Sequence, residues 1–261
     1  MRKETFSFMI ACLIIAIYAV ISLADESLVL YLKLDEGNGD KVKDSSMYGN
    51  NGVIHGAVWV DGKYNSGLDF NGAADVEVPD AKILRLTEQA TIAAWVKVKP
   101  SQEGWGRIVD KSFWQLTGYD LALNSDTKVI QWEFFVDNKT YSAMGKTKLN
   151  DDKWHLVVVT FDNAKKELKG YVDGVIDTVG PLAGQLAGDG TPIKPNDVPL
   201  HLGLYSAGDH HYIGTMDEVA VFNRAIEENE IQGIMEGNAG AGAVTGEGKL
   251  TVVWGAIKLT N

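Results

Sequence analysis

Cysteine is nearly missing from this chain: Cys12 is the only one among 261 residues. It lies in the apolar stretch 6–23, which follows two basic residues and ends in small residues before an acidic pair. This order is typical of a secretory signal peptide, so we expect residues 1–24 to be removed. The alternative is a single membrane anchor, because the stretch is long enough to span a bilayer. Without Cys12 the mature chain has no disulfide bond and no thiol chemistry.

Basic residues are also scarce, since 24 Lys and Arg stand against 35 Asp and Glu for a formal net charge of −11. This balance argues against nucleic acid and anionic membrane surfaces as partners. It is compatible with calcium, which prefers clustered oxygen ligands. A protein without disulfides is stabilised by its core or by a bound ion, and a chain this long buries roughly 70–75% of its unfolded surface.

Short apolar segments separated by turn residues fill the sequence between residues 27 and 222. In 154–161 both sets of alternating positions are largely apolar, which predicts a strand covered on both faces. Asp173-Gly174 predicts a two-residue hairpin turn. We expect further strands at 27–34, 57–60, 67–70, 76–79, 90–98, 107–111, 119–124, 129–136, 140–144, 168–172, 175–178, 199–205 and 212–222.

One segment, 226–235, has the apolar spacing and acidic first turn of a helix. Many short strands with one terminal helix predict an all-β, two-sheet antiparallel jelly-roll sandwich. Gly237–Gly248 is rich in Gly and Ala and predicts a flexible linker before the β-like segment Leu250–Leu259. That tail is either a docked strand, which we favour, or a sorting signal. The expected organisation is therefore a signal peptide at 1–24, a sandwich domain at 25–237 and a tail at 238–261.

The order of these segments resembles the laminin-G-like, concanavalin A-like jelly-roll domains of secreted proteins. The resemblance covers about residues 29–236 and rests on segments such as LYLKLDEGNG, KDSSMYGNNGVIHG, TIAAWVK, DDKWHLVVVTFD and GTMDEVAVFNRAIEENEI. Glu227 departs from it, because the family often has Ser or Thr as the helix N-cap there. The resemblance implies a two-sheet sandwich but little about the ligand, since this fold hosts lectins, hydrolases and passive spacers.

A structural calcium site is the first candidate, with Asp44, Asn50, Asn51 and Asp217 as its ligands. The resemblance implies that the loop holding the first three packs near the late strand that carries Asp217. A hard cation takes six to eight oxygens, which a Gly/Asn loop supplies from carbonyls and side chains. The alternative is that Asp44, Asn50 and Asn51 form turns by bonding their own backbone.

A carbohydrate site built from exposed rings is the second candidate. Trp105 and Trp114 flank a polar stretch, and Tyr205, His210 and Tyr212 lie in YSAGDHHY. Flat rings stack on sugar faces while polar groups bind the hydroxyls. The alternative is that these rings cover the edge of a sheet, and that His210 belongs to a solvated loop.

Catalysis has little support in the sequence. No Glu is followed two residues later by Asp, so the E-x-D-x-x-E pattern that sets two carboxylates on one strand face in β-glucan hydrolases is missing. Glu133 has Phe135 at that position, and neither G-x-S-x-G nor H-E-x-x-H occurs. We therefore expect a non-enzymatic protein, secreted or held at the cell surface or in the periplasm, without membrane insertion after signal cleavage. It would bind a glycan or an extracellular protein; the alternatives are a purely structural surface module and, remotely, a laminarinase-like glycoside hydrolase.

Overall fold

The computed structural model describes residues 25–136, 139–178, 190–206, 208–237 and 239. The predicted signal peptide and the predicted strand-like tail lie outside these residues. Within them, no helix is both long and apolar enough to cross a membrane.

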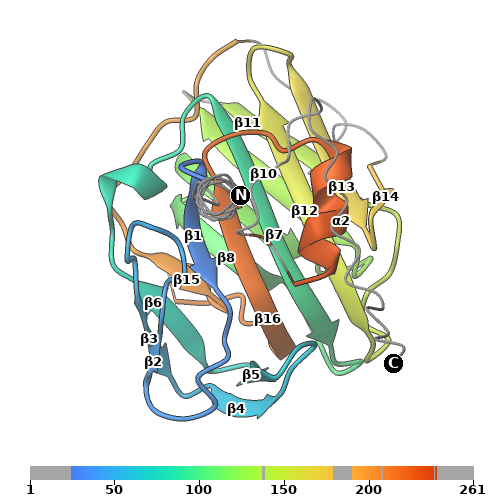
Figure 1. The fold of residues 1–261 in the computed structure, drawn as a ribbon. Coiled ribbons are helices and arrows are strands. Elements are labelled where there is room, and N and C mark those ends of the chain that lie inside the picture. The colour runs from blue at the N-terminus through green and yellow to red at the C-terminus, as the bar shows by residue number, and fades with distance from the viewer. Residues whose placement is uncertain (1–24, 137–138, 179–189, 207, 238, 240–261) are drawn as a thin grey trace, which may run out of the picture. The chain divides into compact units, whose positions relative to one another are not determined.

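The first of two sheets carries the strands that face the viewer in Figure 1. Its strands are β1 (Leu28–Leu32), β4 (Val58–Asp61), β5 (Ser66–Asn71), β7 (Gln89–Val98), β12 (Trp154–Asp162), β13 (Glu167–Val172), β14 (Val175–Ile176) and β16 (Ile213–Phe222). They follow the order β14-β13-β12-β7-β16-β5-β4, and β1 pairs with the part of β16 that β5 leaves open.

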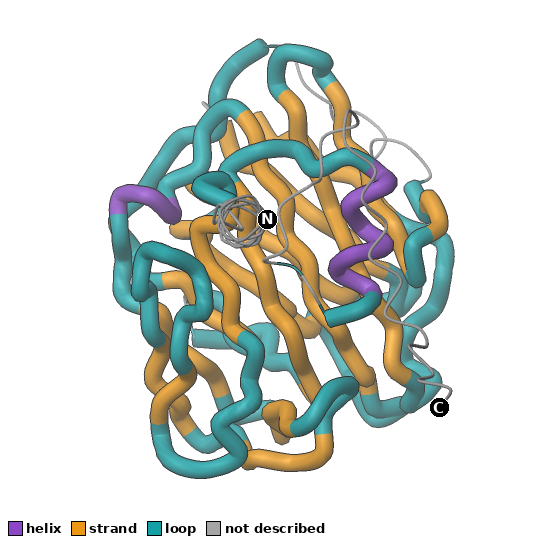
Figure 2. The backbone as a smooth tube through the Cα atoms, viewed as in Figure 1, coloured by secondary structure: helices purple, strands orange, loops and turns teal. Residues whose placement is uncertain are grey.

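The second sheet lies behind the first. Its strands are β2 (Lys41–Val42), β3 (Gly52–His55), β6 (Asp75–Val78), β8 (Gly106–Phe113), β9 (Thr117–Leu123), β10 (Ile130–Val136), β11 (Lys139–Met144) and β15 (Leu200–Leu202). The order is β11-β10-β9-β8-β15-β6-β3-β2, and the strand pairings in both sheets are antiparallel. The predicted all-β, two-sheet sandwich is confirmed, and Figure 2 shows how strand backbone dominates it.

The main core lies between the two sheets because alternate side chains of each strand point inward. Phe134 of β10 stacks on Phe161 of β12 with 4.8 Å between ring centroids, which joins the two layers. Trp132, fully buried, belongs to the same core.

A second apolar cluster covers the outer face of the first sheet. The helix α2 (Glu228–Met235) lies across this face in Figure 1 and packs Ile231 and Ile234 on Leu156 and Val158 of β12. The other face of β12, with Val159, points into the main core. The prediction that this strand is covered on both faces is therefore confirmed.

Two turns show how local chemistry sets the fold. Asp173 and Gly174 both have positive φ, at 52° and 76°, and connect β13 to β14 as the predicted two-residue hairpin. At the start of α2, the carboxylate of Glu230 accepts the backbone N–H of Glu227 at 2.8 Å and the guanidinium of Arg224 at 2.6 Å. The helix thus gains a cap contact without the Ser or Thr that the family often has at Glu227.

Candidate functional site: a ring cluster over a buried arginine

The two tryptophans predicted to flank a polar stretch lie at opposite ends of β8. Trp105 precedes this strand and Trp114 follows it. Nine residues of extended backbone span roughly 30 Å, so the two indoles cannot contact the same sugar unit. Trp114 is 64% exposed at a hairpin tip, next to the exposed Phe113. The stretch that the two tryptophans flank is therefore a strand, and the role of each in binding stays a prediction.

Three of the predicted rings, including Trp105, do come together. His210 lies 5.7 Å from Tyr205 and 6.5 Å from Trp105, measured between ring centroids. The guanidinium carbon of Arg107 is 5.1 Å from the Tyr205 ring and 5.5 Å from the Trp105 ring. Arg107 is buried while Trp105 and His210 stay partly exposed. We call these four residues the ring cluster.

Tyr212 is not part of the ring cluster. It is fully buried and packs edge-on against Phe70, with 6.0 Å between ring centroids. Its hydroxyl donates to the carbonyl of Thr215 at 3.2 Å. A side chain without exposed surface cannot bind an external ligand, so its predicted role in binding is wrong.

Beneath the ring cluster, carboxylates from neighbouring strands form a row across the outer face of the second sheet. Strand register places Asp120 of β9 opposite both Glu133 of β10 and Asp110 of β8. Asp110 and Asp120 are fully buried, and Glu133 is 9% exposed. The chain that carries Tyr205 covers this row and is fixed there by the backbone N–H of Ser206, which donates to Asp110 at 3.3 Å.

Arg107 is the cation of this row. Its Nη1 lies 2.8 Å from Oδ2 of Asp120, but the pair lacks the alignment of a hydrogen bond, and both Asp120 oxygens are without one among the described residues. Burial raises the pKa of Asp120 well above its usual range, against the attraction of Arg107 and with the repulsion of Glu133 and Asp110. Burial also raises the pKa of Asp110, and Arg107 opposes that rise.

Sequence reasoning missed Arg107, Asp110 and Asp120 because they come from two strands and meet Glu133 only through register. A pattern search along one strand finds pairs two or three residues apart, whereas Asp120 and Glu133 are joined across β9 and β10. Residues that face each other across two strands lie as close together as residues two positions apart on one strand. The row therefore contains facing carboxylates, and all three are buried.

The predicted calcium loop is built around Asp44. Its carboxylate accepts the backbone N–H groups of Tyr31, Ser46 and Asn50 at 2.9, 2.8 and 2.7 Å. The side-chain oxygen of Asn51 accepts the N–H of Asp44 at 2.9 Å. The structure thus gathers Asp44, Asn50 and Asn51 in one loop, where Asp44 and Asn51 bond loop backbone and the Asn50 side chain donates to the carbonyl of Val29 on β1 at 2.9 Å.

Asp217, the fourth predicted ligand, lies at a β-bulge of β16. Asp217 pairs with Trp95 and Ala220 with Ala93, so two residues of β16 stand opposite one residue of β7. Glu218, one of these two, has φ of 51°. A bulge bends a strand and redirects its side chains, and here it sets two consecutive carboxylates in a buried place.

The surroundings of the bulge carry little positive charge. Asp217 accepts the backbone N–H groups of Tyr64 and Glu218, each at 2.9 Å, and Glu218 accepts the hydroxyl of Tyr31. Burial, with the nearby Glu218 charge, raises the pKa of Asp217 to about 8. Burial raises the pKa of Glu218 as well, and Lys33 opposes this. Across the described ranges, no three His, Cys, Asp or Glu side chains converge as a metal site.

Residues 70–232 match the Laminin_G_3 family, described as the concanavalin A-like lectin/glucanases superfamily. The chain belongs to this superfamily. The matched residues run from β5 into α2 and include β8, β9, β10 and β16, so the ring cluster and Asp217 lie within them. The resemblance inferred from the sequence is confirmed, and no curated protein matches the chain.

Several solved structures share the fold of this superfamily member. The binding domain of Paraclostridial Mosquitocidal Protein 1 has a TM-score of 0.63 at 17% identity, over 81% of this chain and 52% of that one. The receptor binding domain of botulinum neurotoxin mosaic serotype C/D has a TM-score of 0.61 at 18% identity, over 81% and 51%. The serotype D ligand binding domain, solved in complex with N-acetylneuraminic acid, has a TM-score of 0.60 at 16% identity, over 81% and 51%. The chain spans about half of each, and at these identities the likeness shows the fold alone.

Proposed function

We propose that this protein is an exported, non-catalytic binding domain whose ring cluster recognises carbohydrate or an extracellular protein surface. The observation that carries the proposal is that Trp105 and His210 are held side by side, partly exposed, over the buried Arg107. Ordered rings stack on a sugar face at low entropic cost. Support also comes from the solved structures of this fold, which are named as receptor or ligand binding domains.

A glycan array with the purified domain, run with and without calcium, tests the proposal. Once a glycan is found, we expect Trp105→Ala to weaken binding about tenfold, or ~1.4 kcal/mol. Trp114→Ala is the matched control, because it removes an exposed indole at the far end of β8. If Trp114→Ala loses binding while Trp105→Ala keeps it, the binding site lies at the hairpin tip and not at the ring cluster. An empty array would remove carbohydrate and leave a protein partner or a purely structural module.

A structural calcium ion at the bulge is a second proposal. It rests on Asp217 and Glu218, which are adjacent and buried. Lys33 is the only positive charge that counters the raised pKa of either carboxyl group. Calcium would supply the charge that such a pair lacks, with carbonyl oxygens completing its ligands. Asp44 is a weaker candidate, since its oxygens already accept four hydrogen bonds.

One observation favours a competing activity, glycoside hydrolysis: Asp120 of β9 faces Glu133 of β10. Retaining hydrolases place two carboxyl groups about 5 Å apart on either side of the scissile bond. In this protein Asp120 is fully buried and faces Arg107. We therefore expect the purified domain to release no reducing ends from β-glucans. Release that Asp120→Asn abolishes would replace the binding proposal with hydrolysis.

A further inference from the structure

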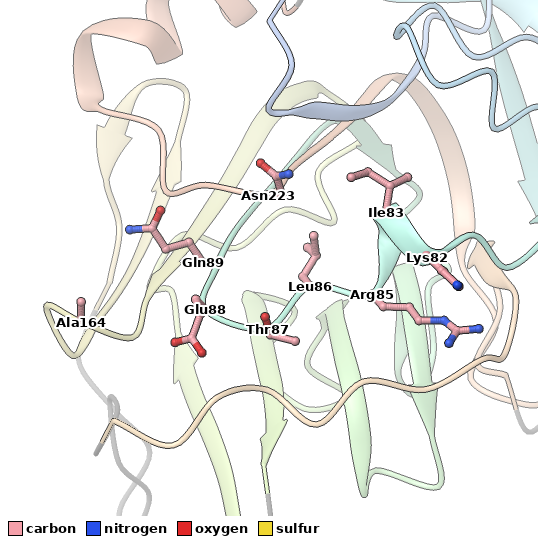
Figure 3. Close-up of a pocket in the computed structure, with 9 residues that line it drawn as sticks. All are labelled: Lys82, Ile83, Arg85, Leu86, Thr87, Glu88, Gln89, Ala164 and Asn223. Atoms are coloured by element: carbon pink, nitrogen blue, oxygen red, sulfur yellow. The ribbon is translucent and has the colours of Figure 1, made fainter.

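A cavity lined by none of the ring-cluster residues opens beside the short helix η1 (Lys82–Leu84). Its volume is about 510 Å³, which suits a small ligand. Figure 3 shows the side chains that line it: Lys82, Ile83, Arg85, Leu86, Thr87, Glu88, Gln89, Ala164 and Asn223. They come from η1, the loop that joins it to β7, the first residue of β7, the turn after β12 and the residue after β16.

One end of this cavity is cationic. Lys82 and Arg85 are three residues apart on a 3-10 turn, where such positions lie above one another, and Figure 3 shows both side chains on the same side. Asp80 is the carboxylate beside them, and it accepts both Arg85 at 2.5 Å and the ammonium of Lys111 at 2.7 Å. The charge of Asp197 also acts on Arg85 and Lys111, so two acids face these two cations, while Lys82 has no ion-pair partner among the described residues.

Arg85 keeps donor capacity after pairing with Asp80. It uses Nε and Nη2 toward that carboxylate, which leaves Nη1 for another acceptor. The hydrogen bonds from Arg85 lower the pKa of Asp80, so this acid stays charged and fixes the guanidinium. A chain with a formal net charge of −11 therefore presents two neighbouring cations at the mouth of a cavity.

The opposite end offers groups that recognise hydroxyls. In Figure 3, Glu88 and Gln89 lie toward this side, away from Lys82 and Arg85. Glu88 accepts Asn163 at 2.8 Å with one oxygen, and Gln89 donates to Asp162 at 2.9 Å, so each keeps an oxygen that can accept. The Glu88 charge disfavours a second anion there, whereas hydroxyl groups can donate to it.

We propose that this cavity binds a sugar unit with a single negative charge. Its anionic group, a carboxylate or a sulfate, would pair with Lys82 and Nη1 of Arg85. Its hydroxyls would bond to Gln89 and Asn223. The site does not depend on the ring cluster, so either can fail without the other.

Calorimetric titration of the whole domain tests this with three trisaccharides of equal length: neutral xylotriose, a xylose trisaccharide with one uronic acid, and one with a single sulfate. We expect both acidic sugars to bind about tenfold more tightly than xylotriose at low salt, and the preference to shrink at high salt. Binding of the uronate alone would assign the site to carboxylates, and binding of the sulfate alone would assign it to sulfates. Equal affinity for all three would overturn the proposal.

Substitutions locate the site. Lys82→Ala, on an exposed side chain, should remove most of the preference for acid, and Lys148→Ala, also exposed but outside the cavity, should keep it. Side-chain amide resonances of Gln89 and Asn223 should shift on titration of the uronate. Shifts at the Trp105 indole in their place, or an unchanged preference in Lys82→Ala, would contradict the assignment.

Discussion

At the scale of single residues, Arg107 connects the surface to the buried carboxylates. Its guanidinium supports the rings of Trp105 and Tyr205 on one side and neutralises Asp120 on the other. Burying an arginine is costly unless its charge is paired. Removing this one side chain would therefore loosen the rings and leave buried acids without a cation.

We expect Arg107→Met to lower the free energy of unfolding by about 3–5 kcal/mol near neutral pH, as for other broken buried ion pairs. The pKa of Asp120 is already raised in the folded state, so folding favours its protonated form. Stability in the variant then falls as pH rises above the unfolded pKa of about 3.9. The deficit should be smaller in acid, where the carboxylates already carry protons.

Urea unfolding at acidic and neutral pH measures this effect, and the double variant Arg107→Met, Asp120→Asn is its control. Removing both charges should restore part of the lost stability, because no Asp120 charge is then left unpaired. A loss below about 1 kcal/mol, independent of pH, would show that Arg107 does not neutralise the row.

Residue roles were the least predictable from sequence. Tyr205 and Tyr212 lie in the same polar stretch, yet one supports Arg107 and the other fills the core beside Phe70. Local composition is the same for both, and Tyr212 reaches the core where its backbone N–H donates to the carbonyl of Gly203, a contact within the folded loop that composition does not encode. The match of Asp120 with Glu133 likewise depends on pairing between β9 and β10, which no local pattern encodes.

At the scale of elements, β13 and β10 approach closely because one residue has no side chain. A Cβ added to Gly170 of β13 would lie 2.4 Å from Cη2 of Trp132 on β10. Trp132 is fully buried between the sheets and cannot move outward. The glycine thus provides the room that the indole fills in the core.

We expect Gly170→Ala to destabilise the domain by about 1–3 kcal/mol through overpacking, measured by urea unfolding. Trp132→Phe combined with Gly170→Ala should cost less than the sum of the two single changes, since the smaller ring leaves space for the methyl group. Additive costs would show that the methyl group is accommodated elsewhere.

Elements with strong local patterns were predictable from sequence, and weak ones were not. The apolar alternation in β12 predicted a strand with two buried faces, and the Asp173-Gly174 turn predicted the hairpin that follows it. By contrast, β2 and β3 fall in a stretch of Gly, Asn and Ser that predicts a loop. Those short strands form because β6 offers an edge to pair with, which is a tertiary cause.

At the scale of the whole domain, the bulge at Asp217 lies where distant parts of the chain meet. The backbone of Tyr64 donates to Asp217, and Tyr31 of β1 donates to the adjacent Glu218. An ion bound here would therefore hold several segments together and stabilise the folded state by linkage.

We expect a chelator to lower the melting temperature of the domain by roughly 5–10 °C, the effect of a ligand at about 100 times its Kd. Asp217→Asn should abolish the chelator shift, and Asp40→Asn, on an exposed side chain, should keep it. Thermal unfolding followed by circular dichroism measures both. An unchanged melting temperature with chelator would remove calcium from the bulge.

The position of β16 has a consequence for how the protein is made. This strand pairs with β7 on one side and with β5 and β1 on the other, although it is the last strand of its sheet to leave the ribosome. This sheet cannot close before β16 has been synthesised, so it folds through contacts that are distant in sequence. Because these pairings are non-local, we expect the domain to fold more slowly than one of similar size built from local hairpins.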